Sequence, residues 1–474
     1  ISVTGVQTCA LPICKLCIPS PAREVRHQFQ YNVHVLRFEG HKGILYLRIA
    51  NCKCNHGASE QCRIGRLKFQ PVPSGLLTDF YELTMAAGYF EAGKHKHEAT
   101  FELFTRRLPW NRNFILAAGL EQIVDYLKNL RFTAEEIAYL KALPQFQHTR
   151  SDFFDMLSEL RFTGDLFAVP EGTPMFSGEP FLTIRAPLVE AQIAETYLLA
   201  MLGFQSMIAT KAARIVKAAR GRQVVEFGTR RAHSPEAGVL AGRAAYIGGC
   251  GGTSNTEAGF RYGVPVFGTA AHSWVMSFSD ERSAFQRLQE LLGPSTVYLI
   301  DSYDTLEGAR RAAALGRPLW GVRLDSGNLT ELTPVVRRIL DDAGLQDAKI
   351  MATGDLNEYK IHELIAAQAP IDAFGVGTDL ATSSDAPSLG MVYKMVEMDE
   401  DGRRRFTIKL SAEKSTLAGA KQVFRYHDHD VVARSFECAP ASAEALLQPV
   451  MIRDRKSTRL NSSHTDISRM PSSA

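Results

Sequence analysis

The chain has 474 residues, of which 45% are hydrophobic and 22% charged, a composition that is ordinary for a globular protein and long enough for two domains. It has no apolar run of about eighteen residues and no signal-peptide pattern at its start, so we predict a cytoplasmic protein without a membrane contact. The net charge of +3 comes from the two ends of the chain. Residues 1–70 contain ten Lys or Arg and three Glu, a net charge of +7, and residues 454–474 contain four Lys or Arg and two acidic residues, a net charge of +2. Residues 71–453 therefore carry a net charge of −6. This acidic body offers no support for a nucleic-acid partner.

The two ends of the chain differ from its body. Six of the eight cysteines lie in the first 62 residues, but the spacing of Cys52, Cys54 and Cys62 does not match a zinc site, so we predict no metal-ligating residues. The opening ISVTGVQTCALPI and the ending DRKSTRLNSSHTDISRMPSSA resemble translated sequencing-adapter read-through. We therefore expect residues 1–71 to be a non-native, unstructured leader and residues 454–474 to be a non-native tail.

The first regular periodicity follows Asp79, where apolar residues at helical spacing end before Gly93. This pattern predicts a helix with a polar N-cap and a glycine after its last turn. Residues 163–187 alternate short apolar runs with Gly and Pro turn pairs, which is typical of a small β-rich unit. Three further helical segments are predicted: Thr133–Leu143, Asp152–Leu160 and Leu188–Ala219, the last as one long helix or two consecutive ones.

The pattern then becomes strand, polar tip, helix. Apolar strands end near Asp301, Asp325, Asp355 and Gly377, and these tips are 24, 30 and 22 residues apart, the length of one βα unit. The repeat predicts an irregular, TIM-like α/β barrel with its polar strand ends on one face.

The strands become antiparallel past Met391. We expect residues 391–453 to return to residues 72–200 and to form with them a discontinuous α+β domain. Residues 201–390 would then form the barrel domain.

Charged residues stand at several of these strand ends. Arg230 follows Phe227 at the end of an apolar strand, where a guanidinium can bind phosphate oxygens, although surface Arg pairs are common in any barrel. His272 lies at the mouth of another strand, where an imidazole can accept a proton or a phosphoryl group. A lone His is more often structural, but Asp301 on the next tip is suited to hold the ring in one tautomer.

Arg323 and Asp325 share one face of a strand end, because side chains alternate along a strand. The Arg is suited to a planar acid or a phosphate and the Asp to ribose hydroxyls; a salt bridge that only closes the barrel is the alternative. Two later turns, Gly354-Asp355 and Gly375 to Thr378, present backbone N–H groups suited to a 5′-phosphate, or are only tight turns.

Six motifs occur in one order: LLTDFYELTMAAGY, EFGTRRAHSPEAG, GGTSNTEAGFRYGVPVFGTAAHSWV, LIDSYDT, GVRLDSGNL and FGVGTDL. Together they resemble nicotinate phosphoribosyltransferase across about residues 72–453. The resemblance implies an enzyme of NAD salvage that forms nicotinate mononucleotide and pyrophosphate from nicotinate and phosphoribosyl pyrophosphate. It also implies ATP hydrolysis coupled through a phosphohistidine, Mg²⁺ as cofactor, and a homodimer with shared active sites.

The resemblance further implies roles for single residues. His272 matches the transiently phosphorylated His, and Asp301 matches its support. Tyr81 matches the ring-sandwiching Tyr that comes from the partner subunit, and Phe227 matches the aromatic that stacks on the pyridine ring. The remaining matches are Arg230 for phosphate, Thr269 and Arg323 for nicotinate, and Asp325, Gly354, Gly377 and Thr378 for the phosphoribosyl group, with Asp355 and Gly375 in the same turns.

Ser254 bears on the choice of substrate. The similar nicotinamide enzyme has an Asp where this chain has Ser254, and a carboxylate at about 4 Å would repel nicotinate by roughly 1 to 4 kcal/mol. The serine therefore favours the acid. The alternatives are quinolinate phosphoribosyltransferase, which needs no phosphorylatable His, nicotinamide phosphoribosyltransferase, and an inactive truncated fragment.

Overall fold

The structure, a computed structural model, describes residues 74–453 without residues 401, 412, 413, 415, 439 and 441, together with the backbone of residues 458–460. The chain divides into two compact units, Ile1–Pro71 and Val72–Ala474, and every described residue belongs to the second. The predicted leader and most of the predicted tail lie outside the described residues. None of the described helices combines the length and the apolar composition that crossing a membrane requires.

The helices of the N-terminal part follow their local signals. α1 (Phe80–Glu91) starts after Asp79 and is followed by Gly93 at φ +71°, as predicted. α3 (Ala134–Ala142) begins with a capping box between Thr133 and Glu136. The predicted long helical segment forms two consecutive helices. The other elements here are α2 (Leu120–Asn129), η2 (Pro144–Phe146), α4 (Ser151–Glu159), α5 (Leu188–Ile193) and α6 (Glu195–Ala218).

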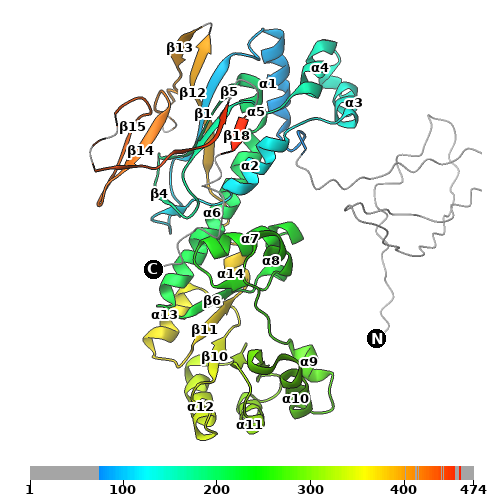
Figure 1. Ribbon diagram of the computed structural model, residues 1–474, viewed down its shortest axis with the longest axis vertical. Coiled ribbons are helices and arrows are strands. Elements are labelled where there is room, and N and C mark those ends of the chain that lie inside the picture. The colour runs from blue at the N-terminus through cyan, green and yellow to red at the C-terminus, as the bar shows by residue number, and fades with distance from the viewer. Residues whose placement is uncertain are drawn as a thin grey trace, which may run out of the picture. The chain divides into compact units, whose positions relative to one another are not determined.

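Strands from both ends of the described chain form one antiparallel sheet, with α1, α2 and α5 beside it (Figure 1). Within the described ranges it has seven strands in the order β13-β12-β1-β5-β3-β17-β18, and two small sheets, β15-β14-β16 and β2-β4, accompany it. β1 pairs with β12 on one side and with β5 on the other, so segments some 300 residues apart share a sheet. A discontinuous α+β domain requires this arrangement, and its exact bounds stay predictions. The strands are β1 (Glu98–Thr105), β2 (Ile115–Leu116), β3 (Asp165–Ala168), β4 (Pro174–Met175), β5 (Pro180–Pro187), β12 (Met391–Glu400), β13 (Arg403–Phe406), β14 (Lys421–Arg425), β15 (Asp430–Arg434), β16 (Glu444–Ala445), β17 (Gln448–Arg453) and β18 (Thr458–Leu460).

The middle of the chain forms a parallel sheet. Among the described residues its order is β7-β6-β11-β10-β9-β8, and one parallel bridge joins Thr253 to Val266 beside β7. β11 returns to pair with β6, so the order follows the chain around a ring, but no described pairing joins Val266 to β8. The α/β class is therefore confirmed, and closure into a barrel stays a prediction. The strands are β6 (Gln223–Glu226), β7 (Gly252–Thr253), β8 (Val297–Leu299), β9 (Gly321–Leu324), β10 (Lys349–Ala352) and β11 (Ala373–Val376).

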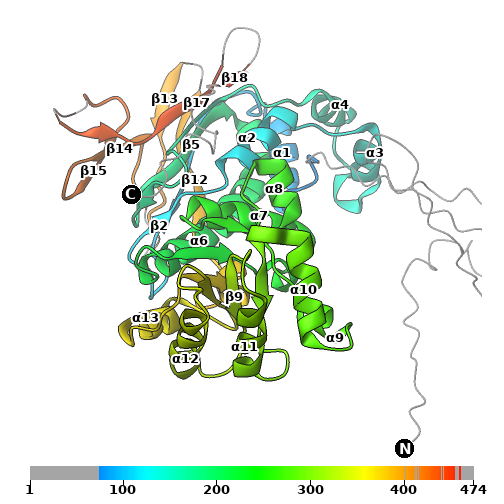
Figure 2. The same ribbon diagram turned by 60° about the horizontal axis from the view of Figure 1, so that its bottom comes forward.

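Helices follow these strands, as the predicted βα repeat requires, and α11, α12 and α13 lie beside the parallel sheet (Figure 2). They are η3 (Thr229–Arg231), α7 (Pro235–Ile247), α8 (Thr256–Tyr262), α9 (His272–Met276), α10 (Glu281–Leu292), η4 (Gly293–Ser295), α11 (Thr305–Leu315), α12 (Leu329–Asp342), α13 (Glu358–Ala366) and α14 (Thr378–Ala381).

Two hydrophobic cores underlie the two sheets, and α6 contributes to both. Leu198 and Leu202 lie in the core of the antiparallel sheet, whereas Ile208 and Ile215 lie in that of the parallel sheet. A single helix of 24 residues therefore links the two layers without a flexible connection. This continuity fixes the parallel strands, and the side chains at their ends, relative to the rest of the unit.

Candidate active site

A pocket of about 490 Å³ lies at the carboxyl ends of the parallel strands, the edge at which βα folds place their chemistry. Its wall brings together twelve of the fourteen residues singled out from the sequence; Asp301 and Tyr81 are not in it. The twelve are Phe227, Arg230, Ser254, Thr269, His272, Arg323, Asp325, Gly354, Asp355, Gly375, Gly377 and Thr378. Their roles remain predictions, but the convergence that these roles require is present.

The aromatic wall depends on two strands that approach closely. A Cβ on Gly375 of β11 would lie 2.5 Å from the ring of Phe227, so only glycine permits the ring to lie there. Behind Phe227, the buried carboxylate of Glu226 accepts hydrogen bonds from Thr253 Oγ1 at 2.5 Å and from Gly228 N. These bonds tie the turn after β6 to β7, and burial raises the pKa of Glu226.

Arg323 connects three walls of the pocket. Its Nε donates to Thr353 Oγ1 at 2.9 Å, its Nη1 to Thr269 Oγ1 at 2.8 Å, and its Nη2 to Asp325 Oδ1 at 2.6 Å. Its guanidinium carbon lies 5.9 Å from the ring centroid of Phe227. The salt bridge considered as an alternative is thus present, and the pair also lines the pocket.

Thr353 is a pocket residue that the sequence reasoning missed. It donates to Asp325 as well as accepting from Arg323, and it directly precedes the Gly354-Asp355 turn. Its position one residue after the end of β10, in the same βα register as the predicted tips, was the available signal. Burial raises the pKa of Asp325, but the hydrogen bond from Thr353 and the charge of Arg323 outweigh burial and hold this pKa below its ordinary value.

The turn after β10 adopts a strained backbone conformation. Gly354 has φ +90° and Asp355 has φ +47°, and a Cβ on Gly354 would lie 2.0 Å from the carbonyl oxygen of Asp325. Glycine is therefore required at residue 354, and the positive φ of Asp355 stores strain at the pocket wall. The tips of β9 and β10 are thereby held against each other.

The pocket rim carries cations that no described partner neutralises. Arg230 and its neighbour Arg231, which was not singled out, are exposed on η3 and line the pocket; within the described ranges neither side chain forms a hydrogen bond or an ion pair. Their guanidinium groups, without partners among the described residues, can donate hydrogen bonds to the oxygens of a phosphate at this strand end. Ser254 lies nearby, where its N–H donates to the carbonyl of Glu226 at 2.8 Å.

The support of His272 differs from the prediction. Its Nδ1 lies 3.0 Å from Ser302 Oγ, and no described hydrogen bond joins it to Asp301. Asp301 instead accepts from the N–H of Asp325 at 2.8 Å and from Ser326 Oγ at 2.6 Å, which turns this carboxylate toward β9. Adjacent residues at a strand end point in different directions, so the serine of the LIDSYD segment meets the ring and the aspartate braces the neighbouring tip.

Tyr81 lies on α1, away from the pocket wall. It is 46% exposed and hydrogen-bonds to Glu195, and burial together with nearby carboxylates, Glu195 first, raises its pKa. The structure of one subunit thus leaves this ring at the surface. No group of three or more His, Cys, Asp or Glu side chains in the described part is arranged to hold a metal ion.

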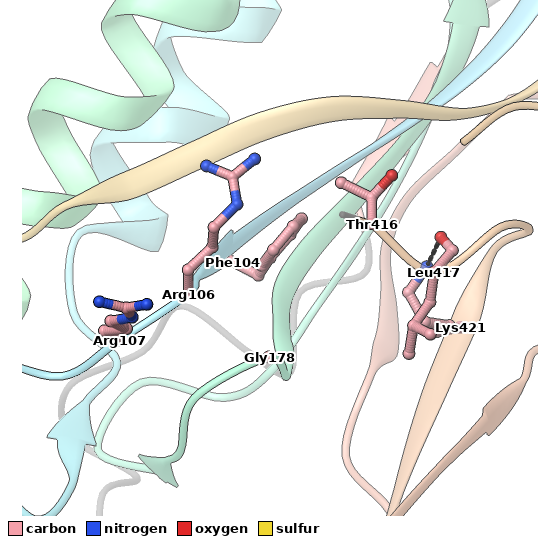
Figure 3. A pocket seen from close by; sticks show the side chains of 7 residues that line it. All are labelled: Phe104, Arg106, Arg107, Gly178, Thr416, Leu417 and Lys421. Carbon is pink, nitrogen blue, oxygen red and sulfur yellow. Dashed lines mark hydrogen bonds between the residues drawn. The ribbon is translucent and has the colours of Figure 1, made fainter. Parts of the chain in front are cut away.

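A second, smaller pocket of about 230 Å³ lies between β1 and the segment before β14. Figure 3 shows Arg106 and Arg107 on one side of it and Lys421 on the other. Arg106 Nε and Nη2 are buried without a hydrogen-bond partner among the described residues, whereas Lys421 pairs with Glu102 at 2.6 Å. An anion is the ligand that unpaired guanidinium donors require.

Comparisons with known proteins agree with this geometry. Residues 76–203 match the family model for the nicotinate phosphoribosyltransferase N-terminal domain, and residues 208–391 match that for the quinolinate phosphoribosyl transferase C-terminal domain. A nicotinate phosphoribosyltransferase of Mycobacterium tuberculosis is 44% identical over 392 residues, which cover 80% of this chain and 82% of the relative. One of Bacillus subtilis is 42% identical over 359 residues, which cover 74% and 72%.

The solved structures give the same result for the fold. The crystal structure of human nicotinic acid phosphoribosyltransferase superposes with a TM-score of 0.71 and 28% identity, and the match covers 82% of this chain and 91% of that one. That of nicotinate-nucleotide pyrophosphorylase from Pyrococcus furiosus gives a TM-score of 0.65 at 28% identity, over 80% and 89%. The predicted resemblance is confirmed: the chain belongs to the nicotinate phosphoribosyltransferase family.

Proposed function

We propose that this chain transfers the phosphoribosyl group of phosphoribosyl pyrophosphate to nicotinate and releases nicotinate mononucleotide and pyrophosphate, a reaction of NAD salvage in the cytoplasm. The convergence of Phe227, Arg230, Arg323 and Asp325 with two N–H-rich turns in one pocket carries the proposal. A TIM-like barrel, closed without a hydrogen bond between Val266 and β8, is the architecture that we propose to hold these groups in place.

Different residues of the pocket would bind the two substrates. Arg323 would bind the nicotinate carboxylate and Phe227 would stack on the pyridine ring. Arg230 and the turns at Gly354 and Gly377 would bind phosphate oxygens, and Asp325 would accept hydrogen bonds from ribose hydroxyls. The nicotinate nitrogen then attacks the anomeric carbon as the bond to pyrophosphate breaks, and the held geometry supplies much of the rate.

ATP coupling would run through His272. The γ-phosphoryl group moves from ATP to Nε2, so that the bond to ADP breaks as the N–P bond forms, and the phosphohistidine is hydrolysed after transfer. Ser302 supports this role, since a hydroxyl that accepts from Nδ1–H leaves Nε2 free as the nucleophile.

Mg²⁺ fits the carboxylate of Asp301, which does not line the pocket but accepts a hydrogen bond from the N–H of the pocket residue Asp325. Asp301 Oδ1 is buried without a hydrogen-bond partner among the described residues, and Mg²⁺ in phosphate sites takes one or two carboxylates plus substrate oxygens. Asp301 would hold the ion together with those oxygens, and the ion neutralises pyrophosphate charge when bound.

A homodimer with shared active sites would use the exposed face that carries Tyr81. Tyr81 is 46% exposed on α1 and does not line the pocket of its own chain. In the proposed dimer each subunit would supply this ring to the pocket of its partner.

The full chain, assayed with phosphoribosyl pyrophosphate and each pyridine acid with and without ATP, tests the proposal. Formation of nicotinate mononucleotide that ATP accelerates is expected. Preference for quinolinate without an ATP effect would favour the rival enzyme, to whose C-terminal domain residues 208–391 are similar. Absence of transfer to any pyridine would mark the chain as an inactive fragment.

Replacing Ser254 with Asp should lower the preference for nicotinate over nicotinamide by about one to three orders of magnitude, because the new carboxylate repels the acid and accepts the amide N–H₂. The ratio of kcat/KM for the two pyridines measures the change. Ser254→Asn, which adds similar bulk without charge, is the matched control. An unchanged ratio in Ser254→Asp would reject this account of selectivity.

A further inference from the structure

A lysine lies buried behind the pocket. Lys211 of α6 has a side chain that is 1% exposed, and its Nζ lies 2.7 Å from Glu358, 3.0 Å from Asp385 and 3.5 Å from Asp379. A buried ammonium group is tolerated only with anionic partners, and here three carboxylates surround it. None of these four residues lines the pocket, and none was singled out from the sequence.

The partners of Lys211 stand directly beside the pocket turns. Glu358 is the first residue of α13, which starts three residues after Asp355, and Asp379 is the second residue of α14, directly after Thr378. One ammonium group therefore joins the turns after β10 and β11, the two segments that present N–H groups to the pocket.

Two arginines balance the remaining charge of the carboxylates around Lys211. Arg112 pairs with Asp385 at 2.9 Å and Arg214 pairs with Glu358 at 2.9 Å, so three cations meet three carboxylates. Burial raises the pKa of Asp385, but the hydrogen bonds from Arg112 and Lys211 outweigh it and hold that pKa well below its ordinary value. Removing Lys211 would leave two cations for three carboxylates, with Asp379 unpaired among the described residues and Glu358 paired only with Arg214, near the strained turn at Gly354 and Asp355.

We propose that Lys211 is a positioning residue that holds the turns after β10 and β11 in register for the phosphate of the phosphoribosyl substrate. The assignment of that ligand rests on the proposed function; the positioning of the turns does not. Lys211 acts through Glu358 and Asp379, so its loss should weaken phosphoribosyl binding more than the chemical step.

The test compares three variants of the full chain. Lys211→Met removes the ammonium group, and Asp379→Asn removes one of its links without disturbing α6. Arg243→Met is the matched control, because Arg243 is also fully buried and paired with Glu121 and Glu171, none of which lines the pocket. Hydrogen–deuterium exchange of the free protein and steady-state kinetics are measured for each variant.

In Lys211→Met, amides of residues 354–358 and 377–381 should exchange at least about tenfold faster, and KM for phosphoribosyl pyrophosphate should rise about tenfold with kcat within about threefold. Asp379→Asn should loosen residues 377–381 alone. Arg243→Met should lower the melting temperature without either local effect. If the exchange of both turns is unchanged in Lys211→Met, the inference is overturned; if the turns loosen while the wild type transfers no phosphoribosyl group, positioning is supported and the proposed function fails.

Discussion

Replacing Arg323 with methionine is expected to lower kcat/KM for nicotinate by about three orders of magnitude. The side chain is 13% exposed and donates to Thr269, Thr353 and Asp325, so it is a pre-oriented cation in the pocket wall. In the proposed complex it faces the substrate carboxylate, whereas Arg230 and Arg231 are proposed to lie against phosphate oxygens at the rim. Steady-state kinetics with nicotinate and with nicotinamide, which lacks the carboxylate, should show a much smaller loss for the amide.

The same variant should shift the acid limb of the pH profile upward. Without Arg323 the charge that helps to hold the pKa of Asp325 down is gone while the burial that raises it remains, so Asp325 becomes protonated at a higher pH than in the wild type. Activity that needs this carboxylate is then lost earlier as the pH falls. Arg337→Met is the control, because Arg337 is 20% exposed and hydrogen-bonded on α12 outside the pocket. An equal loss in both variants, or an unmoved acid limb, would contradict the assignment.

Local features of the fold could be predicted because their causes are local. Gly93 follows the last turn of α1 in a left-handed conformation, and the capping box of Thr133 and Glu136 begins α3; both features need only neighbouring residues. The repeat of polar tips is likewise a property of short segments, and it predicts the parallel sheet and most of the pocket wall. Closure of the ring could not be predicted in this way, because it depends on how the segment at Val266 lies against β8 in space, which neither segment decides alone.

The ionic framework behind the pocket could not be predicted from the sequence. Lys211 forms ion pairs with Glu358, Asp379 and Asp385, which lie about 150 or more residues later in the sequence. The sequence around a lysine in an apolar helix does not indicate such distant partners. The sequence also could not show that Ser302, rather than the predicted Asp301, contacts the ring of His272. Two neighbouring polar residues follow one strand, and only the backbone direction of the loop decides which of them reaches the ring.

Replacing His272 with alanine is expected to abolish the acceleration by ATP and the transfer of the γ-phosphoryl group to protein, while slow phosphoribosyl transfer persists. The imidazole is the only nucleophile proposed for the phosphoryl group, whereas Arg323, Asp325 and the turns that bind the other substrates are left intact. Labelling with ATP carrying a radioactive γ-phosphate, followed by acid and base treatment, detects the acid-labile phosphohistidine. His362→Ala removes an exposed imidazole from α13 and should change neither readout.

Substitutions at Ser302 test whether the orientation of the His272 ring, and not only its presence, matters for phosphorylation. Ser302→Ala keeps the nucleophile but removes the acceptor at Nδ1, so the rate of phosphorylation should fall about tenfold, and Ser302→Thr should restore much of it. Ser273→Ala, which removes the neighbouring exposed hydroxyl of α9, should leave the rate unchanged. Full phosphorylation in His272→Ala would place the phosphoryl group elsewhere. Normal phosphorylation in Ser302→Ala would instead retain His272 as nucleophile and remove Ser302 as the group that sets its tautomer.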